Sequence, residues 1–418
     1  MIHPNEKPRL VQGKTLFAVV ALGFIILLSS VSASAKQAQS ELDFKLKLLV
    51  RQGSVLVADD QDVLYRFPAV ANPQLVPASL LKLATALVAL HYLGPEFRFR
   101  TDFYLTENRT LAIKGYGDPF LVSEEWLRIA QNLGQIPELP KQLNRVLFDT
   151  SLFSSKIKIP GIEFSTNPYD AQNGALVLNF NTVFLQVDKQ GFVSSAEKQT
   201  PLTPFTQRLG KNLTAGKHRI SIPKNSGTTY AGELVQAFLT EAGFSFASGK
   251  VSLSKISSGD RLIYTHKNTT ALTEVIAGMM RYSNNFTANQ LLLSVGLKRY
   301  GEPATLEKGR SALEEYLRDK LGIPEQQFRI AEGSGISRKN RLTPEAVWRL
   351  LRAFEPYQDL LHGGDGILFK TGTLRGIYSM AGFLPSREPL YFVILLNQSQ
   401  NNRDKILKLL LATDFSGT

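Results

Sequence analysis

A serine and a lysine stand three residues apart in the segment Ser79-Leu80-Leu81-Lys82. On a helix, residues at this spacing share a face, so the hydroxyl and the amine would be neighbours. A serine beside a basic group is the usual arrangement of a nucleophile and the base that activates it. The spacing alone is weak evidence, because four further pairs share it: Ser155/Lys158, Ser195/Lys198, Ser221/Lys224 and Ser252/Lys255.

Ser79 differs from those four serines in its surroundings. It follows Pro77 and Ala78 at the start of a segment, residues 80–93, that is apolar on nearly every face and is followed by Gly94. This pattern predicts a helix buried on most sides. The first N–H groups of a helix are unpaired and its dipole favours negative charge, so Ser79 would lie where an oxyanion is stabilised. A purely capping role for Ser79 is the alternative.

A second motif, Ser283-Asn284-Asn285, lies between two predicted helices. Its hydroxyl could exchange a proton with Lys82, and the amide of Asn285 could hold a substrate amide. The same serine–asparagine spacing recurs at residues 165–167 and 399–401, so an ordinary helix-to-helix turn is the alternative.

A third motif, Lys370-Thr371-Gly372-Thr373, is the only tetrapeptide of its kind in the chain and ends a predicted strand. Lys370 and Thr371 offer a positive charge and a hydroxyl to a carboxylate. Gly372, which has no side chain, would let a substrate approach the backbone closely. A phosphate-binding loop is excluded because Phe369 stands where that motif requires glycine.

The elements around these motifs follow from periodicity and caps. Residues 97–264, which are rich in short alternating runs and turns, predict a mostly β block. Elsewhere the sequence predicts strands within 48–66, at 366–371, 377–383 and 390–396, and helices at 124–133, 230–243, 286–297, 305–321, about 344–354 and 402–413. The two outer parts can share one α/β core, with the middle block inserted at a loop, where added residues cost little closure entropy.

Composition excludes several classes of protein. The chain has 418 residues, 43% hydrophobic and 20% charged, so it is neither largely disordered nor a polytopic membrane protein. It has no cysteine, which excludes disulfides, cysteine nucleophiles, iron–sulfur clusters and cysteine zinc sites. Five scattered histidines form no helical ligand pair, so no metal or other cofactor is predicted. The net charge of +12 favours an anionic partner.

Residues 1–35 have the layout of a secretory signal peptide. A basic start precedes an apolar run of 13 residues, 16–28, and Ala33-Ser34-Ala35 forms a small-residue cleavage site. The sequence therefore predicts a periplasmic or otherwise extracytoplasmic protein without a stable membrane span after cleavage, and argues against a nucleic-acid partner. A retained single-span anchor is the alternative, although the run is short for a bilayer.

In their order, the three motifs resemble the signature of penicillin-binding proteins and serine β-lactamases. Further segments resemble the class C low-molecular-mass penicillin-binding proteins, the D-alanyl-D-alanine carboxypeptidase/endopeptidase family of the penicillin-binding protein 4 type. These segments are residues 76–82, 91–95, 117–119, 282–285, 333–338 and 370–374. The resemblance covers nearly all of the mature chain, and it explains the long separation of the first two motifs, since that family carries extra domains there.

The resemblance implies a β-lactamase/transpeptidase-like fold of the α/β (α+β) class, with an antiparallel sheet flanked by helices. It divides the chain into a signal peptide (1–35), the first part of the transpeptidase-like domain (36–96), an inserted β-rich block (97–264) and the second part of the domain (265–418). It also implies action on peptidoglycan stem peptides through an acyl-serine intermediate, with β-lactams as covalent inhibitors.

The resemblance implies a role for each site residue. The expected catalytic residues are Ser79, Lys82 and Ser283, with Lys82 as the general base and Ser283 as the proton relay. Asn285 is expected to position the acyl chain and the backbone N–H groups of Ser79 and Thr373 to form the oxyanion hole. The expected substrate-binding residues are Asn285, Lys370, Thr371, Gly372 and Thr373.

Three departures from the family pattern stand out. Glu332 replaces the usual Asp before Gly-Ser-Gly, Asn289 replaces a common Glu after Ser-Asn-Asn, and the stretch 356–369 is shorter than usual. Two other functions remain open on the sequence alone. One is a β-lactamase or esterase on the same core, and the other is a non-catalytic cell-wall binding protein.

Overall fold

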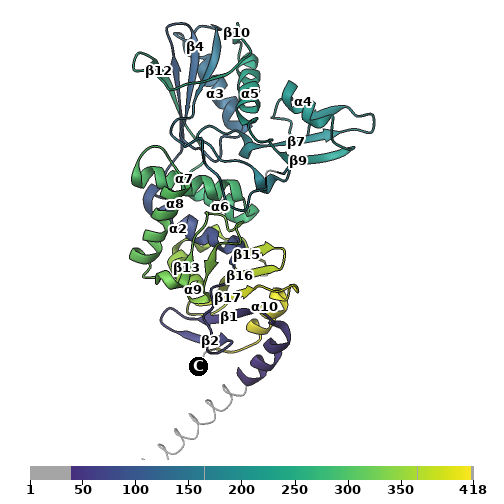
Figure 1. The fold of residues 1–418 in the computed structure, drawn as a ribbon, viewed down its shortest axis with the longest axis vertical. Helices are drawn as coiled ribbons and strands as arrows, with labels where there is room; N and C mark the ends of the chain where they lie inside the picture. Colours follow the sequence, from purple (N-terminus) through teal and green to yellow (C-terminus); the bar gives the residue numbers. More distant parts are fainter. Residues whose placement is uncertain (1–38, 164, 365, 416–418) are drawn as a thin grey trace, which may run out of the picture.

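The computed structural model describes residues 39–163, 165–364 and 366–415. The predicted signal segment, residues 1–35, lies outside these ranges. The described part is elongated, with a helix-flanked sheet at one end and the block from β3 to β12 at the other (Figure 1). Over these ranges, no helix combines the length and the apolar character needed to cross a bilayer.

The sheet nearest the termini is antiparallel and has five strands. Its order is β15 (Phe369–Leu374), β16 (Ile377–Leu384), β17 (Leu390–Leu396), β1 (Gly53–Ala58) and β2 (Val63–Phe67). Strand β1 pairs with β17 from Gly53↔Leu396 to Ala58↔Tyr391. The two outer parts of the chain therefore form one sheet, and the predicted fold class is confirmed.

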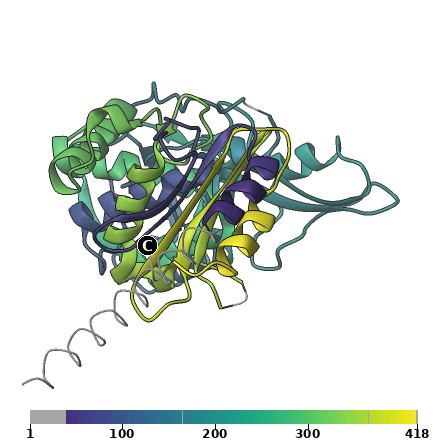
Figure 2. The same ribbon diagram turned by 90° about the horizontal axis from the view of Figure 1, so that it is seen from below.

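Both faces of this sheet are covered because its central strands are apolar on both sides. In β1, Leu56 belongs to one core and its neighbours Val55 and Val57 to the other. The first core lies under α2 (Leu81–Leu93), α6 (Leu272–Tyr282), α7 (Asn285–Tyr300), α8 (Leu306–Glu315) and α9 (Pro344–Phe354). The second lies under α10 (Arg403–Leu411) and the helix over residues 39–49, which run side by side in Figure 2.

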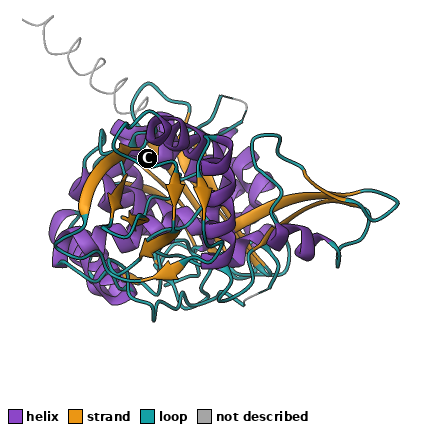
Figure 3. Ribbon diagram, turned by 90° about the horizontal axis from the view of Figure 1, so that it is seen from above, coloured by secondary structure: helices purple, strands orange, loops and turns teal. Residues whose placement is uncertain are grey.

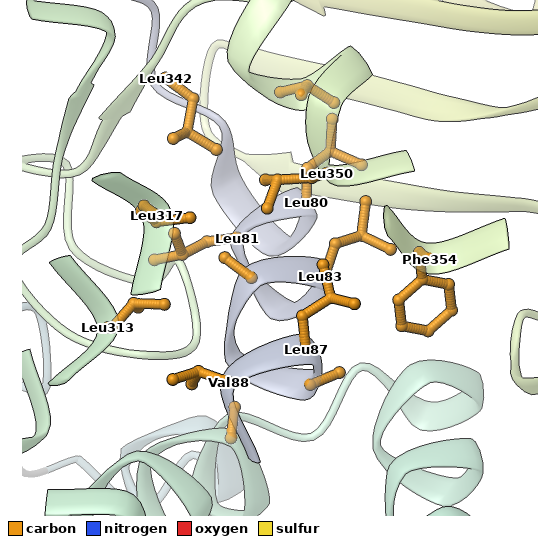
Figure 4. Close-up of a cluster of buried hydrophobic side chains, with 14 of the residues drawn as sticks. Leu80, Leu81, Leu83, Leu87, Val88, Leu313, Leu317, Leu342, Leu350 and Phe354 are labelled. Carbon is orange, nitrogen blue, oxygen red and sulfur yellow. The ribbon is translucent and has the colours of Figure 1, made fainter. Parts of the chain in front are cut away.

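Helix α2 is the central helix of the larger core. Every residue from Leu81 to Leu90 is buried, and the helix ends at Gly94, whose φ is +91°. Leu81 lies on the side of Leu313, while Leu83 lies on the side of Phe354 (Figure 4). The all-round apolar pattern of this segment thus predicted its position correctly.

Of two local predictions near the motifs, the position of Ser79 at the head of the buried helix is confirmed, and the bounds of one strand were wrong. Ser79 lies in a 3₁₀ turn, Ala78–Leu80, that precedes α2. The strand predicted at 366–371 is β15, Phe369–Leu374, so the third motif lies inside the strand rather than at its end. Pairing with β16 fixes these bounds, whereas Gly366, with φ +77°, belongs to the turn before the strand.

The block between β3 and β12 has its own hydrophobic core. Its main sheet has the order β11 (Ser252–Leu253), β6 (Arg145–Asp149), β4 (Thr110–Gly115), β3 (Arg100–Leu105) and β12 (Arg261–Lys267). The principal helices there are α3 (Ser123–Gly134), α4 (Pro204–Gly210) and α5 (Gly227–Glu241). A three-stranded sheet of β8 (Val193–Ser195), β7 (Thr182–Val187) and β9 (Gly216–Ser221) projects to the side (Figure 3). The domain boundaries stay a prediction, and β12 runs past the predicted boundary at 264 to Lys267.

Two glycines let neighbouring segments press against the Ser79 turn. A Cβ on Gly372 would lie 2.4 Å from Ser379 Oγ and 2.7 Å from Ser79 N. A Cβ on Gly335, whose φ is +86°, would lie 1.8 Å from Ala78 O. Since real Cβ atoms do not come this close, only glycine allows these approaches.

We expect Gly372→Ala to lower the free energy of unfolding by about 1–3 kcal/mol, because the added methyl must displace the Ser79 turn or β16. Gly259→Ala is the matched control, since a Cβ there meets nothing within 4 Å. The control should change stability by less than about 0.5 kcal/mol. Urea unfolding measures both, and equal stabilities would contradict the close approach of β15 to the turn.

Candidate active site

The Lys82 ammonium group is fully buried and has three oxygen acceptors. Its side chain is 0% exposed. Nζ donates hydrogen bonds to Ser79 Oγ (3.0 Å), Asn285 Oδ1 (2.8 Å) and Ser334 O (2.8 Å). The contact between Lys82 and Ser79 is therefore present, whereas in the second motif Asn285 rather than the Ser283 hydroxyl bonds to Lys82.

Two influences lower the proton affinity of Lys82 and one opposes them. Burial holds the pKa of Lys82 well below its usual value of 10.5, and the nearby Lys370 lowers it further, while Glu332 raises it. A lysine in this environment loses its proton at lower pH than an exposed one. The neutral amine could then accept the Ser79 proton across the contact between them.

The second motif lies at the junction of α6 and α7. Ser283 ends α6 in the left-handed conformation, with φ +51°. Asn284 caps α7, and its side chain accepts a hydrogen bond from Thr287 N (3.0 Å). These two local features turn Ser283 and Asn285 into the same cleft, which Ser79 also lines.

Lys370 joins the third motif to the second by a hydrogen bond to Ser283. This side chain is 5% exposed, and its Nζ donates to Ser283 Oγ (3.1 Å) and Thr371 O (2.8 Å). Burial, with a smaller contribution from Arg403, lowers the pKa of Lys370 to about 8. Lys370 can therefore hold an anion near neutral pH and lose its charge in mildly alkaline solution.

Arg403, at the start of α10, is a site residue that sequence reasoning missed. Its Nη1 donates to Thr373 Oγ1 (2.9 Å) and Gly372 O (3.3 Å). No motif indicated this residue, because only the fold brings α10 beside β15. Arg403 adds a second positive charge to the end of the cleft where Thr373 lies.

The structure gives Gly372 a different role from the predicted one. The position where its side chain would be is filled by Ser79 N and Ser379 Oγ rather than left open for a substrate. The missing side chain therefore serves the fold, because it lets β15 run beside the Ser79 turn. Thr371 and Thr373, the alternate residues of the strand, line the cleft.

The cleft has a volume of about 450 Å³ and two walls of different origin. The transpeptidase-like part contributes all three motifs together with Arg338 and Arg375. The opposite wall belongs to the inserted block and consists of Gly161, Glu163, Ser165, Asn167, Tyr169 and Asp170. Sequence reasoning missed this wall, since no motif marks it. The cleft therefore offers cations to a chain end on one side and carboxylates on the other.

The two substitutions noted at 289 and 332 are in direct contact. Asn289 Nδ2 donates to Glu332 Oε2 (3.0 Å). Both side chains are buried behind Lys82, with exposures of 1% and 0%. Across the described ranges, no cluster of three or more His, Cys, Asp or Glu side chains could hold a metal ion.

Comparison with known proteins gives a consistent result. A model of the D-Ala-D-Ala carboxypeptidase 3 (S13) family matches residues 51–209 and 212–367. The D-alanyl-D-alanine carboxypeptidase DacB of Haemophilus influenzae is 29% identical over 390 residues, which cover 77% of this chain and 80% of that protein.

Solved structures show the same fold. Penicillin-binding protein 4 (dacB) of H. influenzae superposes with a TM-score of 0.70 at 21% identity, covering 87% of this chain and 94% of that one. Its complex with a β-lactam gives a TM-score of 0.64, at 21% identity and 87% and 93% coverage. A predatory peptidoglycan endopeptidase from Bdellovibrio bacteriovorus gives 0.52, at 15% identity and 87% and 92% coverage.

The family match covers more than half of the chain and includes the first two motifs, and the third follows directly after it. The chain belongs to the D-Ala-D-Ala carboxypeptidase 3 (S13) family and is a serine-type D-Ala-D-Ala carboxypeptidase.

Proposed function

We propose that this protein acts outside the cytoplasm, where it cleaves peptidoglycan stem peptides as a carboxypeptidase, an endopeptidase or both, through an acyl enzyme on Ser79. The observation that carries this proposal is the buried Lys82 amine, which lies 3.0 Å from Ser79 Oγ. A buried amine with a lowered pKa beside a hydroxyl is the arrangement that activates a serine. The predicted signal segment supports the location, and the family membership supports the substrate class.

The acylation step uses the three motifs together. Ser79 Oγ attacks the carbonyl carbon of the penultimate D-Ala, and its proton passes to neutral Lys82. The C–N bond then breaks, and the proton that Lys82 accepted passes by way of Ser283 to the leaving amine, so that Lys82 becomes neutral again. The backbone N–H groups of Ser79 and Thr373 would stabilise the oxyanion, an interaction worth about 100- to 1,000-fold in rate. Water then cleaves the ester and releases the shortened peptide.

The cationic end of the cleft supports recognition of a free carboxylate. Thr371 and Thr373 lie along the cleft face of β15, the buried Lys370 reaches Ser283 Oγ at the edge of the cleft, and Arg403 reaches Thr373 from α10. A terminal carboxylate bound there would place the preceding peptide bond beside Ser79. Charge-assisted hydrogen bonds of this kind are about twice as strong as neutral ones, which would favour exposed chain ends over internal bonds.

The same serine would react with β-lactams. A β-lactam carries a carboxylate and a strained amide, so it can occupy the cleft as a stem-peptide end does. The β-lactam complex of penicillin-binding protein 4 from H. influenzae supports this proposal. The endopeptidase arm is supported by the peptidoglycan endopeptidase from B. bacteriovorus, whose fold is similar.

We expect the protein without residues 1–35 to form a persistent adduct with a labelled penicillin, because Ser79 is acylated and the ester hydrolyses slowly. Ser79→Ala should remove the adduct, whereas Ser155→Ala, a serine with the same spacing to a lysine, should keep it. Intact mass spectrometry measures both. Fast penicillin hydrolysis without an adduct would favour a β-lactamase, and neither adduct nor turnover would favour a non-catalytic wall-binding protein.

We expect kcat/KM for D-Ala release to fall as the pH rises through about 8, the pKa of Lys370. Above this pH Lys370 becomes neutral and loses its attraction for the substrate carboxylate. The pH dependence of kcat/KM reports the ionisation of the free enzyme, which makes it the right measurement.

Lys370→Arg is the matched variant, because its guanidinium group stays protonated throughout this range. It should be less active, yet its kcat/KM should no longer fall near pH 8. A wild-type profile that keeps rising beyond pH 9 would show that the charge on Lys370 does not bind substrate.

A further inference from the structure

Glu332 is a fully buried carboxylate that accepts hydrogen bonds and donates none. Its donors are Ser334 N (2.7 Å), Ser334 Oγ (2.6 Å), Gly335 N (2.8 Å), Ser337 N (3.3 Å), Asn340 Nδ2 (2.6 Å) and Asn289 Nδ2 (3.0 Å). The N–H and O–H groups around it satisfy the lone pairs of both carboxylate oxygens. Glu332 is thus a buried acidic residue that does not line the cleft.

These donors fix the short loop that carries one acceptor of Lys82. The carbonyl oxygen of Ser334 accepts from Lys82 Nζ (2.8 Å), and that of Gly333 accepts from Thr85 Oγ1 (2.6 Å), one turn further along α2. Glu332 binds the N–H groups of Ser334 and Gly335 on the other side of the same peptide units. The carboxylate therefore determines where the Ser334 oxygen lies.

Asn289 connects the Glu332 carboxylate to Asn285, a second acceptor of Lys82. It lies one turn after Asn285 on α7, and its Nδ2 donates both to Glu332 Oε2 (3.0 Å) and to Asn285 O (3.3 Å). Its Oδ1 accepts from Gly333 N (2.8 Å). The turn of α7 that presents the Asn285 side chain to Lys82 is thus tied to Glu332 as well.

We propose that Glu332 is a positioning residue that holds two of the three oxygen acceptors of Lys82, Ser334 O directly and Asn285 Oδ1 through Asn289, and supplies the negative charge that balances the buried ammonium. This proposal rests on the proposed role of Lys82 as the base for Ser79. Glu332 itself touches neither the substrate cleft nor Ser79.

The charges around Lys82 determine the direction in which its pKa would change. Lys370 approaches from β15 and disfavours the ammonium form, with Arg403 behind it on α10, whereas Glu332 favours that form from the segment after β13 (Phe328–Arg329). Removing the charge of Glu332 would lower the pKa of Lys82 further. Lys82 would then be neutral at lower pH. In a plot of the acylation rate against pH, the rising part at low pH, called here the acid side of the profile, would move to lower pH.

The amide at position 289, one of the departures from the family pattern, fits its contact with Glu332. With a carboxylate at 332 that already accepts from residue 289, a second carboxylate at 289 would lie about 3 Å away, and the two could not both stay ionised. An amide at 289 keeps the contact and donates to the single charge. The pair therefore carries one negative charge, which matches one buried ammonium group.

The test is the acylation rate by labelled penicillin across pH, with thermal unfolding measured alongside. We expect Glu332→Gln to move the acid side of the profile down by about one pH unit, because one nearby charge is lost. It should also lower the plateau rate by about 10- to 100-fold, because the acceptors of Lys82 shift. Glu125→Gln removes a buried carboxylate from α3 in the inserted block, where it contacts His266, and should leave the acid side in place.

Glu332→Asp separates position from charge. It keeps the charge, so the acid side should stay at the wild-type pH, but the shorter side chain draws back from Ser334 N and Gly335 N and the plateau rate should fall several-fold. This variant also carries the test if Glu332→Gln does not fold. A wild-type rate in Glu332→Asp would overturn the positioning role.

A Glu332→Gln profile that is lower at every pH but not displaced would overturn the charge role, as would a displaced acid side in Glu332→Asp. Asn289→Glu adds a second carboxylate near Lys82 and should move the acid side to higher pH, and an acid side that stays in place in this variant would also contradict the charge role. Absence of wild-type acylation at every pH would instead refute the proposed function on which this inference rests.

Discussion

The placement of one ammonium group inside the protein determines much of this structure. A lone buried charge is costly, so the fold must either surround Lys82 with acceptors or make it neutral. It does both in part, with oxygen acceptors on three sides and with burial that lowers the pKa of the amine. The three acceptors come from the Ser79 turn, α7 and the loop after β13, and each of these segments must keep its position for the amine to remain buried.

The framework that keeps these segments in register is tightly packed. Helix α2 is buried almost all round, so Lys82 in its first turn cannot move without disturbing the largest core. On the side of the sheet, Gly372 and Gly335 allow backbone to press against the Ser79 turn. Close packing of this kind transmits strain and tolerates little change in volume. The reacting groups therefore lie on rigid elements, which suits a geometry that must be reproduced to a fraction of an ångström.

The inserted block plays a different part in the molecule. It has its own core and mixed sheet, yet its residues 161–163 and 165–170 contribute one wall of the cleft. The three motifs lie on the shared sheet and its helices, whereas this wall of the cleft is a loop, where sequence changes cost little stability. Arg338 and Arg375 share one cleft with Glu163 and Asp170 only because the inserted block lies against the transpeptidase-like part there.

The sequence by itself determined the three motifs, the buried character of α2 and most helix and strand positions, because these follow from local spacing and periodicity. It allowed a sheet shared by the two outer parts of the chain, but the pairing of Gly53 with Leu396 is a tertiary contact. It could not determine the exact start of β15, since strand pairing with β16 decides it, nor the role of Gly372. Tertiary structure alone decided three features of the site: the position of Arg403 beside Thr373, the wall formed by residues 161–163 and 165–170, and the contact between Asn289 and Glu332. Each joins residues that are distant in the chain, and no local pattern encodes a contact that exists only after the core has closed.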